Sequence, residues 1–179
     1  MATTMTLISS YTVTGSSTSI IDFTTIPNTY TDLCIKLSSR HATSGGEDTP
    51  YIRFNNDSGS NYSNVFGSAS ASGAPPQSGS SSTTSFWVGT VPGSTDTSGA
   101  HSKIEIYVPN YAGTTFKKTL QGESTTGLAQ VATSSAYRRI HGGYWNSTSA
   151  INRVTLGIVS AGYNYAVGTT AYIYGIKNS

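Results

Sequence analysis

The sequence has little cysteine and little charge. Its one cysteine, Cys34, excludes an intrachain disulfide framework and any multi-cysteine metal site. Charged residues make up 10% of the chain, against a typical value of ~25%. A helical bundle or coiled coil needs abundant Glu, Lys, Leu and Ala, so this composition excludes one. No apolar run approaches the ~20 residues that a membrane-spanning helix needs, so we expect no membrane partner.

Basic residues are also too scattered to predict a nucleic-acid partner. Ten Lys and Arg residues give a formal net charge of +2, and the only adjacent pairs are Lys117–Lys118 and Arg138–Arg139. Without a basic stripe the chain cannot supply the row of phosphate contacts that nucleic-acid binding needs. The start, Met1–Ser10, lacks the basic and apolar regions of a signal peptide. We therefore expect synthesis and folding in a cytoplasm.

What the sequence does contain is Ser, Thr, Gly and Tyr. Hydrophobic residues account for only 36%, but aromatic residues reach 11%, including 12 Tyr. Disorder requires low hydrophobicity together with high net charge and few aromatic residues, and the last two conditions are not met. The composition predicts an ordered, β-rich protein with a nearly neutral surface.

Apolar residues alternate with polar ones in several short segments. In Asp32–Ser38, Leu33, Ile35 and Leu37 share one face while Cys34 and Lys36 share the other. This period of two is typical of strands with one buried and one solvated face. The stronger strand candidates are Met5–Val13, Ser19–Thr24, Asp32–Ser38, Tyr51–Asn55, Lys103–Val108, Ile151–Ser160 and Thr170–Ile176. The weaker ones are Ser85–Val88, Thr115–Gly122, Leu128–Thr133 and Tyr137–His141.

About eight to ten short strands, with no helical periodicity, predict an all-β protein. We expect one domain over residues 1–179, folded as an antiparallel β-sandwich of the jelly-roll type, since an immunoglobulin sandwich is usually ~100 residues long. Two polar segments interrupt the strands: His41–Thr49 and the Gly/Ser/Pro-rich stretch Gly67–Thr84, which we expect to be a flexible loop. The predicted core residues are Leu33, Ile35, Leu37, Ile52, Phe54, Ile104, Ile106, Leu156 and Ile158.

No catalytic motif is present. His41, His101 and His141 have no metal-binding spacing, and no serine lies in a GxSxG elbow. The acids Glu47, Asp48, Glu105 and Glu123 fit solvated surface better than the paired carboxylates of a glycosidase. We therefore expect no enzymatic activity, no catalytic residue, no metal and no cofactor; a glycan hydrolase is the weakest alternative.

Two further segments have an open interpretation. Asn55–Asn61 is rich in oxygen ligands and could bind Ca²⁺, but it lacks EF-hand spacing and resembles a tight turn. Tyr144, Trp145, Tyr163 and Tyr165 lie beside Gly, Ser or Asn. They form a candidate aromatic patch that binds a sugar or a protein, or else they close the ends of the sandwich core.

Both ends of the chain resemble tailed-bacteriophage virion structural proteins. The pattern lies in Ser10–Thr31 (SYTVTGSSTSIIDFTTIPNTYT) with the following DLCIKLSSR, in Arg53–Ser63 (RFNNDSGSNYS), and in Trp145–Lys177 with its Tyr-Gly-Ile ending. These motifs consist of strand and turn residues, and no catalytic residue carries over. The resemblance implies a non-enzymatic protein on the particle surface, in the capsid decoration or tail-fibre class.

Within that class the chain shows no shaft pattern and no anchoring domain before its first strand. We therefore expect a capsid decoration (cement) protein that binds the major capsid protein, located on the capsid surface of the virion. Low charge and exposed edge strands favour a homo-oligomer, and the resemblance makes it a trimer. The alternative is a tail-fibre or receptor-binding module that recognises a host-surface glycan.

Overall fold

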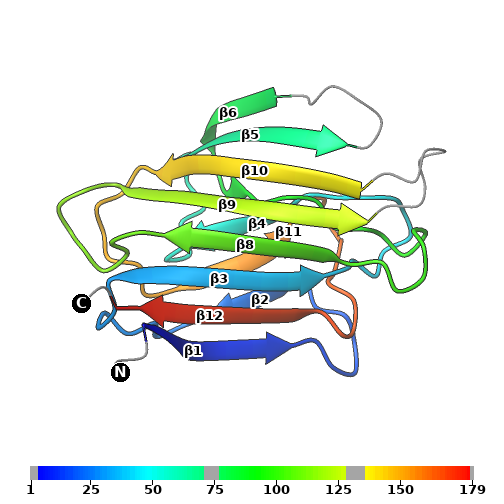
Figure 1. Ribbon diagram of the computed structural model, residues 1–179, viewed down its shortest axis with the longest axis horizontal. Coiled ribbons are helices and arrows are strands. Elements are labelled where there is room, and N and C mark those ends of the chain that lie inside the picture. Colours follow the sequence, from blue (N-terminus) through cyan, green and yellow to red (C-terminus); the bar gives the residue numbers. More distant parts are fainter. Residues whose placement is uncertain (1–3, 71–76, 128–135, 178–179) are drawn as a thin grey trace.

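The computed structural model describes residues 4–70, 77–127 and 136–177, and within these ranges it contains strands and turns but no helix (Figure 1). Two antiparallel sheets pack as the layers of an all-β sandwich. The larger has eight strands in the order β1-β12-β3-β8-β9-β10-β5-β6, and the smaller has four in the order β2-β11-β4-β7. The predicted all-β class is confirmed.

The strands have the following bounds. The eight-stranded sheet contains β1 (Met5–Thr12), β12 (Thr170–Ile176), β3 (Asp32–Ser39), β8 (Ser102–Val108), β9 (Lys118–Gly127), β10 (Ala136–Trp145), β5 (Tyr62–Ser70) and β6 (Gln77–Thr83). The four-stranded sheet contains β2 (Ile20–Phe23), β11 (Val154–Ile158), β4 (Pro50–Phe54) and β7 (Phe86–Trp87).

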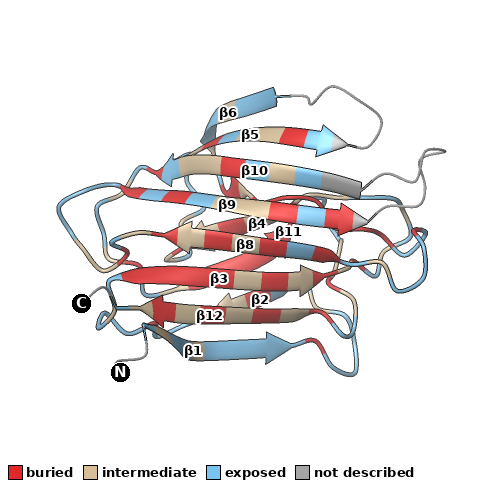
Figure 2. Cartoon of the chain, in the orientation of Figure 1, coloured by how far each residue is buried: buried red, intermediate tan, exposed pale blue. Residues whose placement is uncertain are grey.

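The core lies between the two sheets and is formed by the alternating residues of their inner faces. All nine predicted core residues are buried. In the middle of the large sheet, Ile35 of β3 is paired in register with Ile106 of β8 and with Ile173 of β12. Figure 2 shows the consequence: within the large sheet, β3, β8 and β12 each hold several buried positions, whereas the edge strands β1 and β6 are largely exposed.

The chain passes back and forth between the sheets. Strands β1, β3, β8 and β12 belong to the large sheet, and each is followed or preceded by β2, β4, β7 or β11 of the small one. Two consecutive pairs, β5–β6 and β9–β10, instead stay in the large sheet and extend it on the side of β8. These two pairs provide the outer surface that is described below.

The prediction of a flexible loop over Gly67–Thr84 is wrong for most of this segment. Residues 67–70 continue β5, and Gln77–Thr83 form β6, which pairs with β5 at the edge of the sheet. Residues 71–76, and the weak strand expected at Leu128–Thr133, lie outside the described residues. Strand β6 lacks large apolar side chains because it is an exposed edge strand, so the alternation that marks a half-buried strand is missing.

Cys34 also differs from expectation. It points to the outer face of β3, as its alternation predicts, yet it is buried. Tyr174 and Tyr107 are its partners in register on the two neighbouring strands, so their large side chains flank it. Burial raises the pKa of the Cys34 thiol, and the nearby Glu105 charge adds to this effect. The thiol therefore stays protonated, and this favours an inert structural cysteine.

Candidate functional site

Two of the four residues in the candidate aromatic patch belong to the core. Trp145 is 3% exposed and Tyr165 is fully buried. The Trp145 ring packs against the rings of Phe54 and Tyr62, with centroids 5.8 and 6.3 Å away. The Tyr165 hydroxyl donates a hydrogen bond to the Gly157 carbonyl oxygen at 2.9 Å. Neither ring is available to a ligand at the surface.

The other two aromatic residues, Tyr163 and Tyr144, do not share one exposed surface. Tyr163 is half-buried, and its ring lies 4.8 Å from the imidazole of His41. Tyr144 is 40% exposed on β10, on the outer face of the large sheet, since it alternates with the inward-facing Trp145. The four residues therefore do not form an exposed aromatic patch, and Tyr144 alone borders the surface considered next.

The Asn55–Asn61 segment is a turn held together by its own hydrogen bonds. One oxygen of the Asp57 carboxylate accepts hydrogen bonds from Trp145 Nε1 at 2.6 Å and Asn61 Nδ2 at 2.9 Å, and the other accepts from the Gly59 amide at 2.8 Å. Burial alone would raise the pKa of Asp57, but these hydrogen bonds lower it overall. Because N–H donors occupy both oxygens, the arrangement favours the turn over a cation site.

The three histidines lie in different surroundings. His41 Nε2 lies 2.6 Å from the Gly46 carbonyl oxygen, His101 is exposed, and His141 is buried on the inner face of β10. Over residues 4–70, 77–127 and 136–177, no group of three or more His, Cys, Asp or Glu side chains is placed so that it could hold a metal ion.

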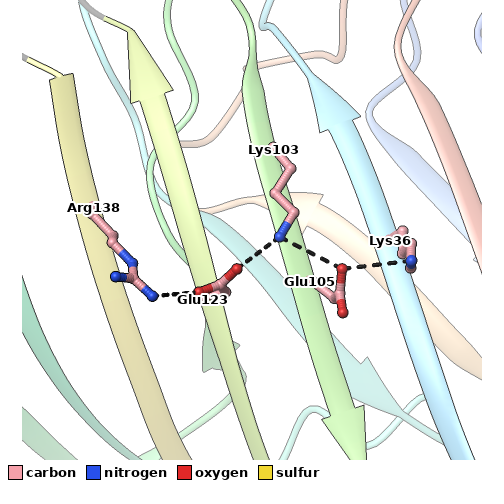
Figure 3. A network of polar contacts seen from close by, with 5 residues as sticks. All are labelled: Lys36, Lys103, Glu105, Glu123 and Arg138. Carbon is pink, nitrogen blue, oxygen red and sulfur yellow. Dashed lines mark hydrogen bonds and ion pairs between the residues drawn. The ribbon is translucent and has the colours of Figure 1, made fainter.

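The outer face of the large sheet carries a ladder of alternating charges (Figure 3). Its members are Lys36 of β3, Glu105 and Lys103 of β8, Glu123 of β9 and Arg138 of β10. Glu105 lies 3.6 Å from Lys36 and 3.5 Å from Lys103, while Glu123 lies 2.8 Å from both Lys103 and Arg138. We call these five residues the charge ladder; it joins four neighbouring strands.

The two carboxylates of the ladder face each other across neighbouring strands. Glu105 and Glu123 are direct partners in the register of β8 and β9, a placement that would be repulsive without the cations between them. Hydrogen bonds from Lys103 and Arg138 lower the pKa of Glu123 to about 2. A glycosidase needs one carboxyl group with a raised pKa as its general acid, and Glu123 has the opposite property.

Beside the ladder the outer face is hollowed. A hollow of about 780 Å³ lies over β9, β10, β5 and β6, and its lining includes Gln121, Ile140, Val65, Gly67 and Gln77. A second, of about 330 Å³, shares Gln121 and Ile140 with it and reaches Glu105, Glu123 and Arg138 of the ladder. A third, of about 380 Å³, shares Val65 and ends at Tyr144. We call the three adjoining hollows the outer groove.

Exposed apolar side chains project into this polar surface. Val65 and Ile140 are each 60% exposed. Ile140 is the register partner of Gly67, two residues along β5 from Val65, so the two side chains are diagonal neighbours on one face. Neither residue was among the predicted site residues. The alternation of Ile140 with His141 was visible, but nothing in the sequence showed which face the second sheet covers.

Comparison of the sequence with family models and with curated proteins found no match to either. No helix long and apolar enough to cross a membrane occurs in the part of the chain that the structure describes.

Proposed function

We propose that the chain is a non-enzymatic structural protein of a tailed-phage virion, acting as a capsid decoration protein that binds the major capsid protein. The motifs at its two ends, which resemble virion proteins, supply the link to phage particles. The observation that supports the proposal most is the strand order of the two sheets.

The strand order fits a jelly roll with two inserted hairpins. Without β5–β6 and β9–β10, eight strands remain, in the orders β1-β12-β3-β8 and β2-β11-β4-β7. Numbered in sequence, these are 1-8-3-6 and 2-7-4-5, the arrangement that two Greek keys produce when a long hairpin folds over into two sheets. Jelly rolls of this kind form viral capsid domains and lectin domains.

The edges of the large sheet support self-association. Strand β1 carries no charged residue, and its Leu7 and Tyr11 are 50% and 40% exposed. Strands β1 and β6 are the two ends of the same sheet. An unprotected edge strand is a template for pairing with another chain. Pairing between two different edges is a heterologous contact, which forms a ring when the rotation between neighbouring subunits closes; we propose that it closes as a cyclic trimer.

We expect lysine at two edge positions to prevent this assembly. In the double variant Leu7→Lys/Tyr11→Lys, each β1 edge carries two positive charges that oppose burial against a second chain. Light scattering of the wild type should give the mass of an oligomer, and the variant should give that of a monomer. The matched control is Phe116→Lys, which places a lysine at a loop position that is 70% exposed and should leave the oligomer intact.

The same preparations test binding to the shell. The wild-type protein should sediment with purified capsids that lack it, and the edge variant should sediment less. A wild type that is strictly monomeric at high concentration and does not bind capsids would refute the proposal. A tail-fibre or receptor-binding module is the second candidate function, and the outer groove favours it; the two functions share one fold and differ in their location on the particle.

A further inference from the structure

We propose that the outer groove binds an extended oligosaccharide chain laid across strands β8, β9, β10, β5 and β6. This inference goes beyond the structural role, because it holds whether the protein sits on the capsid or on the tail. It follows from the shape of the groove, from two glycines that packing does not require, and from the chemistry of the groove walls.

The shape suits a long, narrow ligand. The three hollows adjoin one another through the shared residues Gln121, Ile140 and Val65, and together they cross five neighbouring strands. At a strand spacing of about 4.8 Å, four such gaps span about 19 Å. The largest hollow, about 780 Å³, lies within the range typical of ligand sites. A linear polymer of several units fits this course better than a compact small molecule does.

Two glycines deepen the groove without serving the fold. The register of β10 with β5 and with β9 runs without a bulge at Gly142 and Gly67, and the register shift of β5 against β6 lies between Tyr62 and Asn64, away from Gly67. Neither glycine has a positive φ. A Cβ at Gly67 would meet no atom within 4 Å, and one at Gly142 would make only ordinary contacts, at 3.8 Å with Val65 and 4.0 Å with Leu120. Glycine destabilises the interior of a strand. Because packing does not require glycine at these two positions, its presence there needs another explanation.

The inner face provides the contrast. A Cβ at Gly122 of β9 would clash with the Glu105 carbonyl oxygen, and one at Gly143 of β10 with the Ser63 carbonyl oxygen and the Phe86 ring. Packing alone explains those two glycines. A strand glycine often marks a bulge, a tight bend, or a place where a ligand or another backbone approaches closely. At Gly67 and Gly142 no neighbouring backbone comes close to the Cβ position and the register of β5 with β10 has no bulge, which favours the approach of a ligand.

The walls offer both kinds of contact that a sugar ring uses. Val65, Ile140 and Tyr144 present apolar surface to the C–H faces of the rings. Gln121 and Gln77 carry amide groups that can donate to hydroxyls and accept from them, and Glu105 and Arg138 of the charge ladder close one end. This mixture of apolar surface with a few convergent polar groups is typical of ligand sites.

The charge ladder also distinguishes a glycan from a second protein surface. Three members of the ladder, Glu105, Glu123 and Arg138, line the groove. Burying them against a protein face would remove their water, and the lost solvation must be recovered by new hydrogen bonds. Interface cores are depleted in charged residues for this reason. Hydroxyl groups, in contrast, replace water molecules one for one as donors and acceptors. The ladder therefore favours a polyhydroxylated ligand over a second copy of the chain.

Filling the groove tests the proposal. In the double variant Gly67→Val/Gly142→Val, two side chains occupy the floor, and valine suits a strand, so the melting temperature should stay the same or rise. The matched control is Gly46→Val, at a loop glycine where a Cβ meets nothing within 4 Å. Gln121→Ala, at an exposed position, removes the central amide. The probes are immobilised chito-, cello- and malto-oligosaccharides and smooth and rough bacterial lipopolysaccharide.

At least one of these probes should bind the wild type and the Gly46→Val control equally. The double valine variant should bind it at least about tenfold more weakly, and Gln121→Ala severalfold more weakly. Absence of binding to every probe, or equal binding by wild type and double variant, would overturn the proposal. The proposal would also be overturned if the double valine variant had the mass of a monomer while the wild type had that of an oligomer, because the groove would then bind a second copy of the chain. Sedimentation with capsids should be unchanged in all these variants. Capsid binding therefore tests the decoration role, and oligosaccharide binding tests the groove independently of it.

Discussion

Trp145→Ala should cost about 3–5 kcal/mol of unfolding free energy, the range seen when a buried aromatic side chain is truncated. The indole ring is 3% exposed and packs between β4 and β5 through Phe54 and Tyr62. Its loss also removes the Nε1–H donor from the Asp57 carboxylate, which anchors the Asn55–Asn61 turn. Cavity formation and a lost charge-assisted hydrogen bond thus add to each other.

The measurement is urea unfolding of wild type and variant, followed by far-ultraviolet circular dichroism. Tyr144→Ala is the matched control, because it removes the neighbouring aromatic ring from the solvated face of the same strand and should change stability by about 0.5 kcal/mol or less. Equal losses in the two variants would contradict the assignment of Trp145 to the core and would return it to the surface as a binding residue.

Acidification should destabilise the protein through His141. Burial lowers the pKa of this imidazole to about 4, and the nearby Arg139 cation adds to the effect. The unfolded chain binds the proton near pH 6.5, while the folded protein stays neutral until about pH 4. The contribution of His141 to the free energy of unfolding is therefore fully present above pH 6.5. It is lost as the pH falls from 6.5 to about 4, by about 3 kcal/mol in all.

Replacing the imidazole separates this contribution from that of other groups. His141→Phe keeps a ring at the site but cannot bind a proton, so its stability should depend less on pH between 6.5 and 4. His101→Gln, at an exposed position, should keep the wild-type pH dependence. Unfolding curves at several pH values test this expectation, which fails if wild type and His141→Phe lose the same free energy on acidification.

The central strands could be predicted from the sequence because burial imposes alternation on them. In β3 and β8, Leu33, Ile35, Ile104 and Ile106 face the second sheet, and the pattern places each of them in the core. The same reasoning failed at β6, where both faces are exposed and the sequence QSGSSST carries no apolar period. A strand of this kind is recognised only through its partner β5, which lies earlier in the chain.

The candidate site could not be predicted from the sequence for a related reason. Val65, Ile140 and Gly142 meet because β5 and β10, far apart in sequence, pair side by side, and no local pattern predicts that pairing. The burial of polar side chains could not be predicted from the sequence either. Lys118 is 2% exposed and donates hydrogen bonds to the carbonyl oxygens of Gly113, Phe116 and Thr148, although lysine ordinarily indicates a solvated position.

The abundance of the chain in purified phage particles tests the proposed function most directly. Particles assembled from a genome that encodes the chain can be analysed by quantitative mass spectrometry, with the major capsid protein as the internal standard. A decoration protein occupies a repeated position on the shell, so we expect a fixed ratio to the major capsid protein and retention in tailless capsids. A small copy number that disappears with the tails, or absence from the particle, would contradict it.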